Sequence, residues 1–198
     1  MEVVLPLPTA DLSDAHIGSL DDVTHHQQQQ KPRAVPRGAF RPYGAVERFA
    51  GRVHVVACAA SNAAVRAALE TPGQNRVLVV KPFDAQAARR CAYLGGNLGA
   101  LCVKNGWAGV VVAGMVRDSE EMRATAGLGV MALGTCPLKS SRNPDDPERA
   151  AAEAKEGVDL SAPAGVAVGA AGWAVVREGD VLYVDGDGFV ISDRVLEL

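Results

Sequence analysis

The chain has 198 residues and a formal net charge of −3, and 48% of its residues are apolar, 22% charged and 5% aromatic. This length suits a single well-buried domain over residues 1–198. The slightly acidic balance gives no electrostatic basis for binding nucleic acid, and no stretch reaches the roughly 18 apolar residues of a membrane helix.

The first predicted element is a short helix that begins near Thr9. Thr9 or Asp11 can cap free backbone amides there, and acidic residues favour the positive end of a helix dipole. Two histidines and four glutamines follow at residues 25–30. Clustered histidines can bind a metal, but this composition is more typical of a mobile surface insertion.

A regular alternation of strands and helices begins after Gly51. Apolar, Val-rich runs predict three strands, and helical spacing predicts two helices between them. The strands cover residues 52–58, 76–80 and 109–113, and the helices cover residues 62–69 and 98–105. The second and third strands are so apolar that both of their faces must be covered. The alternation predicts an α/β domain.

Residues 140–161 interrupt this alternation. Two prolines and many charges in this stretch predict a surface excursion with one possible helix, over residues 147–155. The remaining chain predicts four short strands, joined in part by glycine-containing turns. These strands cover residues 165–168, 173–177, 181–185 and 189–192.

The cysteines indicate the cellular compartment. No two of them have the spacing of a zinc site or of a redox CxxC motif. They are Cys58, Cys91, Cys102 and Cys136. The first eight residues lack the basic and apolar regions of a secretory signal. We therefore expect reduced, mostly buried thiols in a cytoplasmic protein.

A glycine pair directly precedes the predicted helix at residues 98–105. Gly95 and Gly96 allow backbone N–H groups to converge, and the helix adds partial positive charge. This arrangement can cradle a carboxylate or a phosphate, although glycines before a helix often form only a turn. The GxGxxG spacing of a dinucleotide site is absent.

A second candidate site follows the predicted strand at residues 109–113. Arg117 and Asp118 lie just past its carboxyl end, where α/β sheets bind ligands. Asp118 could equally be the N-cap of a helix that contains Glu120 and Glu121. Those two acids could also contact metal-bound water, although acidic residues are common at helix starts. The pattern alone leaves these interpretations open.

Three consecutive motifs carry a resemblance to a known family. They are Gly95-Gly96-Asn97-Leu98-Gly99, Asn105-Gly106-Trp107-Ala108-Gly109-Val110-Val111-Val112 and Gly114-Met115-Val116-Arg117-Asp118. This ordered block resembles the signature of the RraA-like family, which includes 4-hydroxy-4-methyl-2-oxoglutarate aldolases and regulators of ribonuclease activity. The family pattern is a glycine, twenty residues and Arg-Asp, which Gly96, Arg117 and Asp118 satisfy.

The resemblance implies a fold, an assembly and roles for the motif residues. The expected fold is a layered β/β/α sandwich similar to the swivelling phosphohistidine domain, assembled as a homotrimer or hexamer with active sites between subunits. The backbone of four consecutive residues would bind a substrate carboxylate: Gly95, Gly96, Asn97 and Leu98. Arg117 would bind the same substrate, and Asp118 would hold a divalent cation, Mg²⁺ or Mn²⁺. A single carboxylate completed by waters suits Mg²⁺, and a guanidinium fork suits a carboxylate.

The implied activity is cleavage of a carbon–carbon bond in a small 2-oxo acid, with release of pyruvate. The chain would act as a 4-hydroxy-4-methyl-2-oxoglutarate aldolase, an oxaloacetate decarboxylase, or both. The alternative is a non-catalytic regulator that binds a ribonuclease or another RNA-processing enzyme. A Schiff-base aldolase would need a desolvated lysine, whereas Lys104 lies at a polar helix end.

Three departures from the family pattern bear on the substrate. Residues 81–84 read Lys-Pro-Phe-Asp where family members often have an acidic residue and glycines. Ala113 stands where Asn or Asp is common. The stretch of residues 140–161 is longer than is usual in the family. All three departures leave the Arg117-Asp118 pair intact.

Overall fold

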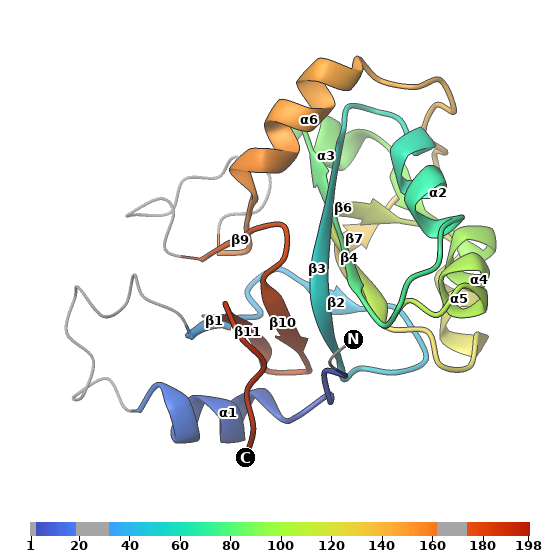
Figure 1. Ribbon diagram of the computed structural model, residues 1–198. Coiled ribbons are helices and arrows are strands. Elements are labelled where there is room, and N and C mark those ends of the chain that lie inside the picture. The colour runs from blue at the N-terminus through green and yellow to red at the C-terminus, as the bar shows by residue number, and fades with distance from the viewer. Residues whose placement is uncertain (1–2, 19–31, 162–173) are drawn as a thin grey trace.

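The computed structural model describes residues 3–18, 32–161 and 174–198 (Figure 1). Its elements, in chain order, are α1 Thr9–His16, β1 Arg33–Pro36, β2 Arg41–Pro42, β3 Phe49–Cys58, α2 Ala63–Leu69, β4 Val77–Pro82, α3 Ala85–Arg90, β5 Ala92–Leu94, α4 Gly96–Lys104, β6 Gly109–Val116, α5 Ser119–Ala124, β7 Val130–Thr135, α6 Pro147–Glu156, β8 Val158–Asp159, β9 Val175–Val176, β10 Val181–Val184 and β11 Gly188–Ser192.

One large mixed sheet organises the described part of the chain. Its strand order is β1-β11-β10-β3-β4-β6-β7-β2, and β5 pairs with β6 beside this path. The long strand β3 joins two kinds of pairing: its first half is antiparallel to β10, and its second half is parallel to β4. The pairs β4–β6 and β6–β7 are also parallel.

The parallel strands are covered on both faces, as their apolar sequences predict. Successive side chains of a strand point to opposite faces. Leu78 and Val110 pack with residues of α2, α4 and α5, whereas Val79 and Val111 pack with residues of β10 and β11. Figure 1 shows these helices and the antiparallel strands on opposite sides of β3 and β4. The fold is therefore mixed α/β, and the closer likeness to the phosphohistidine domain stays a prediction.

The predicted elements between residues 52 and 113 are all present. The strand predicted at 52–58 begins earlier, at Phe49, because it continues into the antiparallel part of the sheet. The strand predicted at 173–177 is shorter, and only Val175–Val176 is extended and paired. The run at residues 25–30 and the strand predicted at 165–168 lie outside the described residues.

The stretch of residues 140–161 differs in part from the predicted surface excursion. The possible helix is present as α6, its N-cap Asp146 accepts a hydrogen bond from the Arg149 N–H at 2.8 Å, and none of its residues is buried. The flanks are packed, however, because Ser140, Val158 and Leu160 are all buried. The expectation of a surface excursion was wrong for these flanks.

Thr9 does not cap α1, contrary to one of the predicted capping arrangements. It lies inside the helix, and its backbone N–H and Oγ1 donate to the Asp185 carboxylate at 2.8 and 2.7 Å. Asp185 also accepts from the N–H of Asp187 at 3.0 Å. An acidic residue of a turn near the C-terminus therefore accepts the hydrogen bonds of the first residue of α1.

The cysteines are buried free thiols, as predicted, except that Cys136 is only half-buried. Burial raises the pKa of the Cys102 thiol to about 12, and burial likewise raises the pKa of Cys58 and Cys91. In the described ranges, no helix has the length and apolar character needed to cross a membrane.

Candidate active site

The two residues that follow β6 have an unusual local conformation. The N–H of Arg117 donates to the Leu94 carbonyl at 3.0 Å, which joins the end of β6 to the end of β5. Asp118 then adopts φ 56° and ψ 41°, the left-handed region. Aspartate and asparagine tolerate this region better than most residues, and such backbone strain is concentrated at functional sites.

The side chain of Asp118 does not cap α5. Asp118 occupies the N-cap position, but its carboxylate makes no capping hydrogen bond. Instead, its Oδ2 accepts a hydrogen bond from the Gly96 N–H at 3.2 Å and lies 3.4 Å from Arg117 Nε. The side-chain capping interpretation was therefore wrong, and the carboxylate joins both candidate motifs.

The glycine pair makes this approach possible. A Cβ on Gly95 would lie 2.6 Å from Asp118 Oδ2 and 3.1 Å from Arg117 Cγ, and a Cβ on Gly96 would overlap the Glu121 carboxylate. Gly95 is extended, at φ −147°, so the requirement for glycine here is space rather than backbone freedom. Gly96 begins α4 and donates to a carboxylate, the arrangement expected of an anion-binding helix start.

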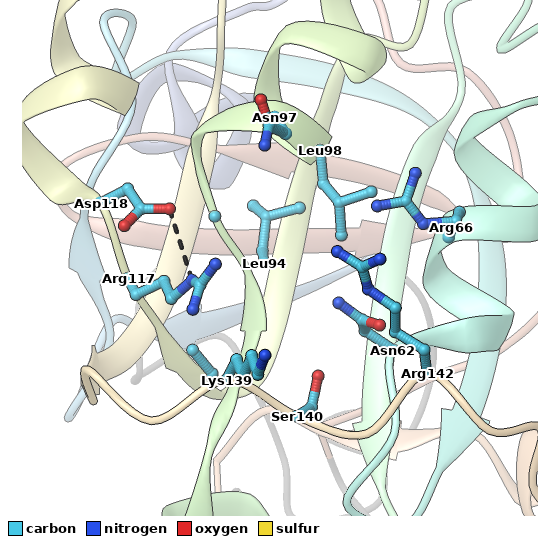
Figure 2. A pocket seen from close by; sticks show the side chains of 12 residues that line it. Asn62, Arg66, Leu94, Asn97, Leu98, Arg117, Asp118, Lys139, Ser140 and Arg142 are labelled. Carbon is cyan, nitrogen blue, oxygen red and sulfur yellow. Dashed lines mark ion pairs between the residues drawn. The ribbon is translucent and has the colours of Figure 1, made fainter.

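A solvent-open pocket lies beside this pair (Figure 2). Its wall comes from the start of α2, the β5–α4 junction, the end of β6 and the segment after β7. The lining residues are Asn62, Arg66, Ala92, Leu94, Gly95, Asn97, Leu98, Arg117, Asp118, Lys139, Ser140 and Arg142.

The pocket is cationic. Four of the lining side chains carry positive charge, and Asp118 carries the one negative charge among them. The cations are Arg66, Arg117, Lys139 and Arg142. Arg117 and Asp118 are each about two-fifths exposed, with relative side-chain areas of 38% and 40%, so a ligand in the pocket can reach both. Such a pocket favours an anionic ligand.

The structure brings the predicted site residues together. The pocket is lined by Gly95, Asn97, Leu98, Arg117 and Asp118, and Gly96, which does not line it, donates its N–H to Asp118. Sequence reasoning missed five lining residues from two other segments: Asn62, Arg66, Lys139, Ser140 and Arg142. No local motif marks them, because only the fold places their segments beside Arg117.

The departures at residues 81–84 and 113 lie elsewhere, whereas Ser140 and Arg142 of the longer stretch line the pocket. Lys81 forms ion pairs with Glu153 and Glu156 of α6, both at 2.9 Å, and Asp84 caps α3. Ala113 is buried in the sheet. None of these side chains lines the pocket, so they do not contact a ligand held there.

Asp118 can serve as a cation ligand, but the described residues supply few further ligands near it. Residues 3–18, 32–161 and 174–198 contain no group of three or more His, Cys, Asp or Glu side chains able to hold a metal ion. One carboxylate with several waters nevertheless fits Mg²⁺, which keeps much of its hydration shell. The donor set is therefore compatible with the expected cation.

Two further candidates do not belong to this pocket. Lys104, the lysine considered for a Schiff base, is exposed at the far end of α4 and does not line the pocket. Asp185, in the acidic turn near the C-terminus, is engaged by Thr9.

Comparison with known proteins identifies close similarities over nearly the whole chain. The family model described as RraA-like, Aldolase/RraA, matches residues 9–191. A protein of Burkholderia mallei (strain SAVP1) named "Putative 4-hydroxy-4-methyl-2-oxoglutarate aldolase" is 41% identical over 188 residues, which cover 95% of this chain and 96% of that protein.

Two solved structures are also similar. The structure of the RNA-processing inhibitor RraA from Thermus thermophilis has a TM-score of 0.70 and 31% identity, covering 96% of this chain and 94% of that one. A structure described as an S-adenosylmethionine:2-dimethylmenaquinone methyltransferase from Geobacillus kaustophilus HTA426 has a TM-score of 0.68 and 33% identity, with coverages of 96% and 97%.

Proposed function

The chain belongs to the RraA-like (Aldolase/RraA) family, and from this premise we propose that it is a lyase that cleaves a carbon–carbon bond of a 2-oxo acid and releases pyruvate. One observation carries the proposal: the Asp118 carboxylate, the Arg117 guanidinium and the Gly96 N–H converge beside a cationic pocket. An acid, a fork-shaped cation and backbone donors are the groups that such a reaction needs.

The chain's own residues would bind and orient the substrate. The backbone at the start of α4, from Gly95 to Leu98, would hold the 2-oxo acid's carboxylate. The Gly96 N–H already donates to Asp118 and the Leu98 N–H to the Gly95 carbonyl, so the N–H groups of Gly95 and Asn97 would make this contact. Arg117 would bind the 2-oxo oxygen and stabilise the negative charge that develops on it. Both groups line the same pocket, so one ligand can contact them together.

Asp118 would hold the divalent cation, Mg²⁺ or Mn²⁺. When bound, the cation would supply Lewis-acid stabilisation of the developing enolate. Asp118 has two carboxylate oxygens, and Gly96 and Arg117 both approach Oδ2. That leaves Oδ1 available to a cation, while the other two contacts hold the carboxylate in place.

Both candidate reactions break the C3–C4 bond and leave the same enolate. In 4-hydroxy-4-methyl-2-oxoglutarate, the 4-hydroxyl loses its proton to a water molecule, the C3–C4 bond breaks, and the electron pair of that bond forms pyruvate enolate. The other product is a second pyruvate, and the enolate takes up a proton at C3. In oxaloacetate, the C3–C4 bond breaks with loss of CO₂ and yields the same enolate. Arg117 can therefore serve both reactions.

We further propose a trimer or a hexamer, with a neighbouring subunit completing the site. Among the residues that the structure describes, Asp118 is the one carboxylate that lines the pocket, and the pocket is open to solvent. Groups from a second copy of the chain could close it and add polar contacts, as closed symmetric assemblies allow.

A direct assay tests the proposed activity. Purified protein is incubated with oxaloacetate or with 4-hydroxy-4-methyl-2-oxoglutarate, with Mg²⁺, with Mn²⁺ or with a chelator, and pyruvate is measured. We expect pyruvate release that depends on the added cation. Protein that is inert toward both acids with either metal would contradict the lyase proposal.

The second candidate function is regulation of a ribonuclease. The observation in its favour is the 31% identity to the Thermus structure described as an RNA-processing inhibitor. Such a role needs a partner-binding surface rather than a reactive pocket. Inert protein that binds and inhibits a ribonuclease would establish it.

A further inference from the structure

We infer that Lys81 and Phe83 are positioning residues for the pocket, although neither of them lines it. They attach α6 to the end of β4. Through α6 they hold residues 140–145, named here the clamp segment, so that Ser140 and Arg142 stand in the pocket wall. The inference goes beyond the proposed function, and only its kinetic readout rests on that proposal.

Lys81 holds the C-terminal end of α6. Its Nζ donates to the Glu153 carbonyl at 2.9 Å, and the Glu153 and Glu156 carboxylates both lie 2.9 Å from it. The Glu153 carbonyl is one of the last four of the helix, which have no partner within it. The side chains of Lys81 and Glu153 are only 17% and 22% exposed, so solvent screens their contact less than it screens a surface ion pair.

Phe83 holds the N-terminal end of the same helix. The Arg149 guanidinium, in the first turn of α6, lies 4.3 Å from the centre of the Phe83 ring, which is a cation–π contact. Ala154 packs against the core that includes Val55 of β3, and Figure 1 shows α6 beside β3. Because α6 has no buried residue of its own, the side chains of Lys81 and Phe83 supply much of its attachment to the sheet.

The clamp segment connects α6 to the loop of residues 59–62, which lies between β3 and α2. The Ser141 N–H donates to the Ala60 carbonyl at 2.8 Å. The Asp145 carboxylate accepts a hydrogen bond from the Ala59 N–H at 3.1 Å. Only the N-cap residue separates the clamp segment from α6, so a displacement of the helix also displaces this segment.

Alternate residues of the clamp segment have different roles. Residues 141, 143 and 145 bond to the loop, and the contact of the middle one runs from the Ser61 Oγ to the Asn143 carbonyl at 2.6 Å. Ser140 and Arg142 line the pocket instead. The bonds to the loop therefore fix where the pocket-lining side chains of this segment stand.

The Arg117-Asp118 pair is held by other elements. The Arg117 N–H donates to the Leu94 carbonyl and the Asp118 carboxylate accepts from the Gly96 N–H, so neither bond involves α6 or the clamp segment. Figure 2 shows Arg142 across the pocket from this pair. A loosened α6 should therefore weaken ligand binding and leave the reacting groups in place. Residues 81–84 and 140–161, which both depart from the family pattern, thus form one structural unit.

The test replaces Lys81 by Met, which keeps the apolar stem and removes the charge. Lys81→Arg keeps a cation and is the conservative variant, and Lys104→Met removes an exposed charge outside the pocket as the matched control. Two readouts are compared. The first is KM and kcat for oxaloacetate with Mg²⁺, and the second is hydrogen exchange of the amides at residues 59, 62 and 141. Thermal melting verifies that each variant is folded.

We expect Lys81→Met to raise KM roughly two- to thirty-fold with kcat nearly unchanged, the range expected for changes along a packed network. The three amides should exchange faster, because their hydrogen bonds join the loop to the clamp segment. Lys81→Arg should recover most of both effects, and Lys104→Met should match the wild type. If Lys81→Met does not fold, Arg149→Met loosens the other end of α6 at an exposed residue and should give the same pattern.

An unchanged KM in an active, folded Lys81→Met protein would overturn the inference, and so would unchanged exchange of the three amides. A fall in kcat with KM unchanged would also overturn it, because the reacting groups would then have moved. The exchange readout needs no turnover, so failure of the lyase proposal is separable. A wild-type protein that is inert toward oxaloacetate loses the lyase proposal, while faster exchange in Lys81→Met still supports the attachment of the clamp segment.

Discussion

The Asp118 carboxylate accepts a hydrogen bond from the Gly96 N–H at 3.2 Å, although 22 positions separate the two residues in the chain. This bond joins the glycine pair before α4 to the acid that follows β6. The predicted anion cradle therefore already contacts an anion, which belongs to the protein itself. The same contact places Asp118 beside Arg117 and makes their roles separable by substitution.

Replacing Asp118 by Asn should abolish metal-dependent activity without unfolding the protein. Asparagine also tolerates the left-handed backbone that Asp118 adopts, so the change removes charge and little else. We expect pyruvate release to fall by at least roughly 10²-fold and to respond poorly to added cation. Because the side chain does not cap α5, the free energy of unfolding should change by no more than about 0.5 kcal/mol. A folded, fully active variant would remove Asp118 from the mechanism.

Replacing Arg117 by Lys tests the guanidinium fork. Lysine keeps the positive charge but cannot make two parallel hydrogen bonds to one oxygen pair. We expect kcat to fall by roughly 10²-fold or more, the effect of losing one preorganised donor to the transition state. Steady-state kinetics with oxaloacetate measures it. If only KM rises and kcat is unchanged, Arg117 binds the substrate without stabilising the developing charge.

Replacing Gly95 by Ala should displace the Asp118 carboxylate from the glycine pair. The added Cβ would lie 2.6 Å from Asp118 Oδ2, so the carboxylate must move. Gly95 has an extended backbone that alanine adopts readily, and the protein should remain folded. Activity should fall while circular dichroism and the melting profile stay close to those of the wild type. Gly179→Ala is a useful contrast. A Cβ at Gly179 would meet no atom within 4 Å, but the residue has a positive φ, so this substitution should lower stability and leave catalysis unchanged.

Acid pH should weaken the attachment of α1. Burial raises the pKa of Asp185, but hydrogen bonds from Thr9, Asp187 and Gly188 outweigh it and leave this pKa below its ordinary value. A lowered pKa means that the ionised form stabilises the fold above the unfolded-state pKa, near 3.9, and that this stability is lost as pH falls through the folded value. Asp185→Asn should therefore lower the free energy of unfolding by about 1–3 kcal/mol at pH 7 and by less at pH 3.

Urea unfolding of both proteins at pH 7 and pH 3 measures this difference. If the substitution lowers the free energy of unfolding equally at both pH values, the negative charge of Asp185 does not stabilise the contact with α1.

Light scattering at micromolar concentration should give three or six times the chain mass of 20.6 kDa. A stable particle at the single-chain mass would contradict the proposed assembly, and with it a site completed by a neighbouring subunit. The activity of the same sample, measured over a dilution series, would show whether catalysis depends on assembly.

The pattern of apolar residues by itself determined that the sheet is covered. Strands β4 and β6 are apolar at consecutive positions, and because their side chains alternate between two faces, both faces had to be buried. The order of the glycine pair and Arg117-Asp118 likewise identified the family. The first feature depends on consecutive residues, and the second depends on a fixed spacing along the chain.

The tertiary structure alone decided how the site is assembled. Sequence pattern is equally consistent with Asp118 as a helix cap or as a ligand, and only packing against Gly95 and Gly96 excluded the side-chain cap. Lys139 and Arg142 lie beside or within a stretch expected to be a surface excursion, yet they line the pocket. Their place depends on hydrogen bonds between segments far apart in the chain, which no residue spacing encodes.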